Sequence, residues 1–108
     1  ENIQVRSMVG RFLEHSRVYH FWNDGARDVW IASADWMDRN LLRRVEVACP
    51  IRDRKLKQRV IDEAIVENLR DNSSAWIMDS EGHYQRRRPR GRLPRVAQLR
   101  LLERLAGQ

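Results

Sequence analysis

Residues 17–34, RVYHFWNDGARDVWIASA, join two runs rich in aromatic and β-branched residues through a short polar turn. Residues 17–22 form the first run, residues 28–34 form the second, and Asn23, Asp24 and Gly25 lie between them. Runs of this composition favour strands, and an Asn-Asp-Gly sequence favours the positive backbone angles of a hairpin turn. The segment therefore predicts a β-hairpin.

The residues that follow predict a third strand and then a long helix. Residues 43–49 alternate in the manner of a strand with one face in the core. One face would carry Val45, Val47 and Cys49, and the other Arg44, Glu46 and Ala48. Pro50 closes this strand, and Asp53 is expected to cap a helix that reaches about Arg70. The apolar stripe of that helix consists of Leu56, Val60, Ile61, Ala64, Ile65 and Leu69.

The two ends of the chain complete the expected fold. Apolar residues at helical spacing predict a short helix over residues 6–13 and a terminal helix through Val96, Leu99, Leu102 and Leu105. Residues 75–78 and 83–87 are predicted strands on either side of a turn at residues 79–82. Strands mixed with helices in this way predict an α+β domain whose mixed β-sheet is flanked by helices.

The chain has 108 residues and a formal net charge of +6, a length suited to one domain. Residues 86–108 hold eight Arg against Glu103 alone, whereas residues 1–85 hold 13 Lys or Arg against 14 Asp or Glu. The basic character therefore belongs to one segment. Within it, Pro89, Gly91 and Pro94 predict that residues 86–95 form an extended loop rather than a helix.

The single Cys49 excludes an internal disulfide and, without a Cys/His cluster, a structural zinc site. No apolar run approaches the roughly 18 residues that a transmembrane helix requires. We expect a protein of the cytoplasm, with or without a peripheral contact to the membrane, and no transmembrane segment. Because the chain opens at Glu1 without an initiator Met, we expect it to be a piece of a longer protein.

His15 and Arg17 are the first candidate site residues. They stand two residues apart where a strand begins, so their side chains should leave the same face. An imidazole exchanges protons near neutral pH, and a guanidinium supplies paired donors for phosphate oxygens. Judged by spacing alone, a surface histidine beside a solvated arginine is the more common arrangement.

Residues 33–40, SADWMDRN, form a second candidate because loops after strands often carry sites. The alternative is a loop that caps its own turns through Ser33, Asp35 and Asn40 while Trp36 fills the core. Arg44 and Glu46 fit an exposed ion pair. His20 and His83 lack ligand-spaced partners and are expected to be structural or exposed, and the Trp residues are expected to fill the core.

Three ordered motifs resemble the last domain of polyphosphate kinase. They are VRS at residues 5–7 with FLEHSRVY at residues 12–19, SADWMDRN at residues 33–40, and RRVEV at residues 43–47 with Pro50 and Ile51. The resemblance covers essentially the whole chain. It implies an enzyme that moves the terminal phosphate of ATP onto a histidine and then onto polyphosphate, reversibly and with Mg²⁺. That histidine would lie in the preceding domain of the same chain.

The resemblance also implies one half of a phospholipase D-like fold. His15 and Arg17 look like the histidine-x-lysine element of such a half, and Ser33 with Asp35 or Asn40 looks like its serine and asparagine tail. The match is degenerate, because Arg17 replaces the lysine and Trp22 stands where an aspartate is expected. The orientation of His15 would then come from Glu14, Asp35 or Glu46.

The roles implied by the resemblance are catalysis for His15 and Arg17, and contact with nucleotide or phosphate for Ser33, Asp35 and Glu46. Arg87, Arg88 and Arg90 of the basic loop would bind polyphosphate, as an arginine ladder suits a linear polyanion. The Mg²⁺ ligands are expected outside this chain, and the full-length enzyme is expected to be a homo-oligomer that acts on ATP, ADP and polyphosphate. The alternatives are a nucleic-acid-binding module and a scaffold whose basic loop docks onto an acidic partner.

Overall fold

A computed structural model describes residues 2–107, and the chain divides into two compact units, residues 14–65 and residues 1–13 with 66–108. Within the described residues, six strands form two three-stranded sheets, one in each unit, and the strand pairs are antiparallel. The predicted α+β class is confirmed. The strands form two small antiparallel sheets in place of one mixed sheet, because each hairpin pairs with a strand within its own unit.

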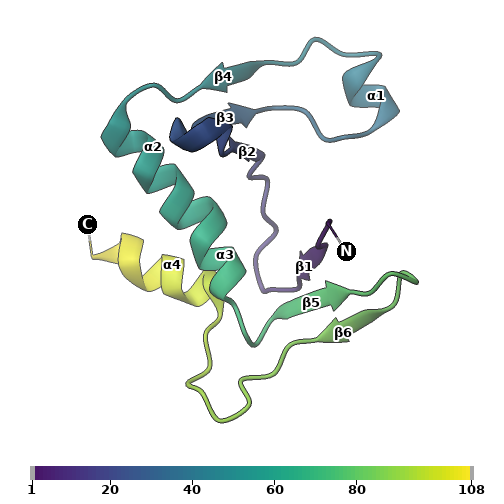
Figure 1. The fold of residues 1–108 in the computed structure, drawn as a ribbon, viewed down its shortest axis with the longest axis vertical. Helices are drawn as coiled ribbons and strands as arrows, with labels where there is room; N and C mark the ends of the chain where they lie inside the picture. The colour runs from purple at the N-terminus through teal and green to yellow at the C-terminus, as the bar shows by residue number, and fades with distance from the viewer. Residues whose placement is uncertain (1, 108) are drawn as a thin grey trace. The chain divides into compact units, whose positions relative to one another are not determined.

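The predicted β-hairpin is present in the unit of residues 14–65 (Figure 1). Strand β2 (Val18–Phe21) pairs with β3 (Asp28–Ala32), and the connection contains the one-turn helix η1 (Asn23–Gly25). Asn23, Asp24 and Gly25 all have positive φ, as the turn sequence predicts. The loop after β3 contains the short helix α1 (Asp38–Leu41), which the sequence did not indicate.

The strand predicted over residues 43–49 is wrong in most of its extent. Strand β4 is Ala48–Pro50, paired with β3 from Ala32↔Ala48 to Trp30↔Pro50. Val45 is 99% exposed and Val47 is 66% exposed, so the expected core face does not exist. Before Ala48 the pairing becomes incomplete: the Ser33 amide still donates to the Val47 carbonyl at 3.0 Å, but the Val47 amide donates to the Ser33 hydroxyl instead of a backbone carbonyl.

The predicted long helix is confirmed from its cap to its end. Asp53 accepts a hydrogen bond from the Leu56 amide at 2.9 Å and caps α2 (Arg54–Val60). The helical stretch continues through η2 (Ile61–Val66), a π-helical segment, and ends in α3 (Glu67–Arg70). Apolar periodicity does not distinguish π from α geometry, so the sequence indicated the stretch but not the π segment.

The other unit contains a sheet in the order β1-β5-β6 and the terminal helix α4 (Ala97–Ala106). The hairpin of β5 (Ala75–Met78) and β6 (Tyr84–Arg86) confirms the two predicted strands, and α4 confirms the predicted helix. The helix predicted over residues 6–13 is wrong, because β1 (Arg6–Met8) pairs with β5. Pairing with a distant strand overrides the local helical spacing, which Gly10 also weakens.

Asp71 holds the parts of this unit together. Its fully buried carboxylate accepts hydrogen bonds from the backbone amides of Ser73, Ser74 and Ala75 and, at 2.8 Å, from Ala97 in the first turn of α4. Burial raises the pKa of Asp71, but hydrogen bonds from Ser74, Ala97 and Ser73 outweigh it, so the pKa lies below its ordinary value. One carboxylate thus joins the start of β5 to the start of α4.

A half-buried ion pair supports the same junction. Both oxygens of Glu67 accept hydrogen bonds from Arg95, each at 2.8 Å. Bonding to Arg95 lowers the pKa of Glu67. The pair ties the end of the basic loop to α3.

The tryptophans do not all fill the core as expected. Trp36 is 78% exposed and Trp22 is 68% exposed. The fully or nearly fully buried apolar residues are small or aliphatic, namely Val29, Ala34, Ile61, Ala75 and Ala97.

We predict that Asp71→Asn destabilises the protein by about 3 kcal/mol, because the neutral amide cannot accept all of these bonds and leaves buried N–H groups unpaired. Since the folded pKa of Asp71 is lowered, its stabilisation is complete above about pH 4 and is lost as pH falls through the folded pKa. Urea unfolding of the two proteins at several pH values measures both effects. Asp53→Ala, which removes only a helix cap, is the reference with a loss of about 1 kcal/mol. If Asp53→Ala lowered the free energy of unfolding more than Asp71→Asn, Asp71 would not be the residue that holds this unit together.

Candidate functional site

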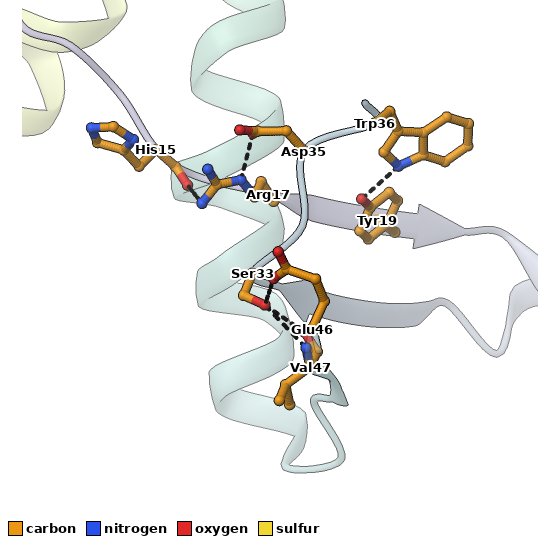
Figure 2. Close-up of polar contacts among 8 residues, drawn as sticks. All are labelled: His15, Arg17, Tyr19, Ser33, Asp35, Trp36, Glu46 and Val47. Atoms are coloured by element: carbon orange, nitrogen blue, oxygen red, sulfur yellow. Dashed lines mark hydrogen bonds and ion pairs between the residues drawn. The ribbon is translucent and has the colours of Figure 1, made fainter. Parts of the chain in front are cut away.

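Most of the predicted site residues meet at one end of the sheet β2-β3-β4. Arg17 immediately precedes β2, Ser33 and Asp35 follow β3, and Glu46 precedes β4. Because β3 is antiparallel to both neighbours, the start of β2, the end of β3 and the start of β4 lie at the same edge. Figure 2 shows these side chains grouped around that edge.

Arg17 and Asp35 form the central ion pair. Arg17 Nε donates to Asp35 Oδ1 at 2.8 Å, and one Nη group donates to the backbone carbonyl of His15 at 3.1 Å. The hydrogen bond to Asp35 raises the pKa of Arg17, and the hydrogen bond from Arg17 lowers the pKa of Asp35. The pair therefore stays charged at neutral pH, with the guanidinium held in one position. A guanidinium has five N–H donors, so these two bonds leave donors for an anionic ligand.

Ser33 and Glu46 form a second contact at the same edge. The Ser33 hydroxyl donates to Glu46 Oε2 and accepts a hydrogen bond from the Val47 amide at 3.0 Å (Figure 2). Glu46 was expected to pair with Arg44, but the described ion pairs of this unit do not include Arg44. The sequence brought Ser33 and Glu46 into the same candidate set without indicating that they touch.

His15 is exposed just before β2. Figure 2 shows its imidazole apart from the other side chains drawn, on the far side of Arg17 from Ser33 and Glu46. The backbone of His15 is fixed through its carbonyl bond to Arg17, whereas two of the carboxylates expected to orient its ring have other partners. Asp35 bonds to Arg17 and Glu46 bonds to Ser33. The structure thus places His15 beside the cluster and does not bring its ring together with Asp35 or Glu46.

Asn40 is a buried polar residue next to this cluster. It is 3% exposed, and a hydrogen bond from its side chain helps to lower the pKa of Asp35 after the larger effect of Arg17. Its Oδ1 atom has no hydrogen-bond partner within residues 2–107. A buried carbonyl oxygen without a donor is rare and marks a polar position that packing alone does not explain.

An aromatic pair that sequence reasoning missed borders the cluster. Trp36 Nε1 donates to the Tyr19 hydroxyl at 2.7 Å, and the two rings stack with centroids 6.2 Å apart. The signal was present in the sequence, because Tyr19 repeats the two-residue spacing of His15 and Arg17 along one strand face. The hydrophobicity of Trp36 instead favoured a place in the core.

The predicted polyphosphate-binding residues lie in the other unit. Arg88 and Arg90 line a concavity of about 650 Å³ together with Arg70, Arg86, Arg87 and Arg92. Arg87 donates to the backbone carbonyls of Asp71 at 3.1 Å and Leu69 at 3.4 Å, so its guanidinium has a structural task. The loop is not extended throughout, because positive φ angles at Arg90 and Gly91 produce a tight turn closed by the Arg92 amide on the Pro89 carbonyl.

The remaining candidates lie outside these two places. His83 is exposed, 3.4 Å from Asp79, and Cys49 is exposed with a free thiol. Across residues 2–107, no group of three or more His, Cys, Asp or Glu side chains is arranged to hold a metal ion. In the same residues, no helix is long and apolar enough to cross a membrane.

The edge of the sheet can therefore do three things chemically. Arg17 can neutralise an anionic oxygen, Ser33 can donate or accept one hydrogen bond, and His15 can exchange a proton nearby. These are the functions that phosphoryl transfer requires of a protein, since most of its catalysis is positioning and charge stabilisation.

Comparisons with known proteins agree along the chain. The family model described as "Polyphosphate kinase C-terminal domain 2" matches residues 1–98. Proteins named polyphosphate kinase from Burkholderia ambifaria (strain MC40-6) and Burkholderia lata are 66% and 67% identical over 102 residues, which is 94% of this chain and 15% of each relative. The crystal structure of polyphosphate kinase from Porphyromonas gingivalis superposes with a TM-score of 0.89 at 40% identity over 98% of this chain and 16% of that one.

The chain thus spans about 15% of the length of the curated relatives that it matches. The similarity includes the edge that carries Arg17, Ser33, Asp35 and Glu46, because the matched family model runs through all of them. This chain belongs to the polyphosphate kinase family, as the C-terminal domain that the family model describes.

Proposed function

We propose that the longer protein is a polyphosphate kinase that reversibly transfers the terminal phosphate of ATP to polyphosphate. This chain would contribute His15 and Arg17 to a site that the preceding domain completes. The observation that supports the proposal most directly is the Arg17 guanidinium, held by Asp35 at an edge that also carries Ser33 and Glu46. Family membership and high identity to proteins named polyphosphate kinase support it independently.

The proposed reaction consists of two successive phosphoryl transfers. A histidine nitrogen of the preceding domain forms a bond to the γ-phosphorus of ATP while the bond to the bridging oxygen breaks, and ADP leaves. A terminal oxygen of polyphosphate then forms a bond to this phosphorus while the phosphorus–nitrogen bond breaks, which regenerates the free histidine. The reverse sequence makes ATP from ADP.

Each side chain has a separate proposed role. Arg17 stabilises the charge on the nonbridging oxygens, with Asp35 as its positioning partner. His15 protonates a departing oxygen or stabilises the phosphate. Ser33 and Glu46 contact the nucleotide or its phosphates, since the hydroxyl that now bonds to Glu46 can rotate toward a phosphate oxygen.

The Mg²⁺ that such a reaction implies does not fit the residues of this chain. Within the described part of the chain, no three ligand side chains gather, and Asp35 and Glu46 are engaged by Arg17 and Ser33. We propose that its ligands belong to the rest of the protein. The proposal also includes a cytoplasmic location, where ATP is available, and a homo-oligomeric full-length enzyme.

We predict that residues 1–108 alone have no kinase activity, because the phosphate-accepting histidine lies outside them. The measurement is ATP consumption with polyphosphate as acceptor, using the full-length protein as the positive control. Turnover by the isolated residues would contradict a shared site.

We predict that His15→Ala in the full-length protein lowers turnover by about 10²- to 10⁴-fold, the usual range for an acid or base group, while the thermal unfolding curve is unchanged. His83→Ala is the matched control, because His83 is also exposed but lies in a turn of the other unit. His20→Ala is a second control with little expected effect. Equal losses for His15→Ala and His83→Ala would remove His15 from the site.

We predict that Arg88→Gln combined with Arg90→Gln weakens polyphosphate binding and makes its salt dependence shallower, while ATP affinity changes less. These two arginines line the loop concavity, whereas Arg87 also supports the fold. Arg100→Gln with Arg104→Gln removes the same charge from α4 and serves as the control. Competition with DNA tests the alternative of a nucleic-acid-binding module, and an equal loss of DNA and polyphosphate binding would favour it.

A further inference from the structure

A second basic concavity lies in the unit of residues 14–65, away from the site described above. We call it the turn–helix basin, with a volume of about 1050 Å³. The cationic residues that line it are Arg27, Arg52, Arg54, Lys55 and Lys57. They come from the β2–β3 turn, from the loop after β4 and from the first turns of α2, and Figure 1 shows that turn beside the start of α2.

Among residues 2–107, the lining of the basin includes no acidic side chain. Three of the neighbouring carboxylates are engaged locally. Asp28 accepts from Asn23 at 2.7 Å, Asp53 caps α2, and Asp62 accepts from Gln58 at 2.9 Å. The five cations are therefore not neutralised by carboxylates in the basin, and their mutual repulsion favours an anionic occupant.

The turn is held in a strained shape that positions its cation. Arg27 has a φ of +56°, a conformation that residues with a side chain rarely adopt. Its amide bonds to the Trp22 carbonyl at 3.0 Å, and its guanidinium donates to Gln58 of α2 at 2.9 Å. These two bonds fix the turn against the helix, so the cations on the two sides of the basin face one occupant.

The composition of the basin favours phosphate over a protein partner. Arginine forms paired hydrogen bonds with phosphate oxygens, and lysine supplies a mobile point charge. The cores of protein interfaces are enriched in aromatic residues and depleted in lysine, whereas this lining has lysines and no aromatic side chain. Several cations around one concavity are suited to an occupant with several phosphates.

The position of the basin indicates which phosphate compound would reach it. The cluster of Arg17 and Ser33 lies at one end of the sheet, and the basin lies at the other, four residues of β2 away, or about 13 Å at the usual strand rise. A neighbouring hollow of about 370 Å³ shares Arg52 and Lys57 with the basin and extends along β3 to Trp30. A linear polyanion can extend over this distance, whereas a single phosphate cannot.

We infer that the turn–helix basin binds a distal part of the polyphosphate chain whose end reacts at the Arg17 cluster. This inference rests on the proposed function. The basin is a second polymer-binding surface, separate from the arginine loop of residues 86–95, which lies in the other unit.

The test uses the full-length enzyme with Arg52→Gln, Lys55→Gln and Lys57→Gln combined. The KM for long-chain polyphosphate should rise about tenfold, and the slope of binding affinity against salt should become shallower by about one for each phosphate-binding cation removed. Tripolyphosphate, which is too short to reach both ends of the sheet, should be affected much less. The charge-retaining set Arg52→Lys, Lys55→Arg and Lys57→Arg should preserve the wild-type salt slope, which separates a charge effect from a folding defect.

The control set is Arg11→Gln, Arg100→Gln and Arg104→Gln, which removes three exposed charges elsewhere and should leave polyphosphate use unchanged. The inference is overturned if the KM and the salt slope of the basin variant equal those of this control, or if the KM rises equally for tripolyphosphate and for long-chain polyphosphate. It is also overturned if light scattering shows that the basin variant has a changed oligomeric mass, because that result would indicate a protein-docking face. A wild-type enzyme that binds no polyphosphate would instead contradict the proposed function itself.

Discussion

The pairing of β3 with a strand on each side is the constraint on which the candidate site of this chain depends. Because β2 and β4 both run antiparallel to β3, the residues just before β2, just after β3 and just before β4 lie at one edge of the sheet. Arg17, Ser33, Asp35 and Glu46 occupy those positions. A shift of one residue in either register would turn these side chains to opposite faces and separate the ion pair from the Ser33–Glu46 contact.

Charged side chains that support the fold are arranged differently from those at the candidate site. Where a carboxylate supports structure, it is saturated with donors, as in Asp71 beneath α4 and Glu67 on Arg95. At the sheet edge, Asp35 takes only part of the Arg17 guanidinium and leaves donors for a ligand. In the basin beside α2, still more of the positive charge is unpaired, because the described lining has five cations and no acidic side chain. Fixed positive charge of this kind can stabilise phosphate oxygens without rearrangement.

Two segments adopt a structure other than the one that their local pattern predicts, and for the same reason. Residues 6–8 have helical spacing but pair with the strand of residues 75–78. Residues 43–49 alternate like a strand, but of them only Ala48 and Cys49 belong to the strand that pairs with β3. Periodicity measures what a segment can do, whereas pairing depends on which strand edge is available nearby. The core position expected for Trp36 is wrong for a similar reason, since hydrophobicity does not tell which large side chains another element will cover.

Local signals in the sequence were sufficient for the hairpin, the Asp53 cap, the helical stretch to Arg70, the β5–β6 hairpin and the terminal helix. Their determinants are turn residues, caps and short-range periodicity, which act within a few positions of the chain. The motifs also predicted Arg17, Ser33, Asp35 and Glu46 as members of one candidate site, and the structure brings these four residues to the same end of the sheet. Only the tertiary structure decided that Asp35 holds Arg17, that Glu46 meets Ser33 and that Arg27 faces α2, because each of these interactions joins residues 13 to 31 positions apart through strand pairing and turn geometry.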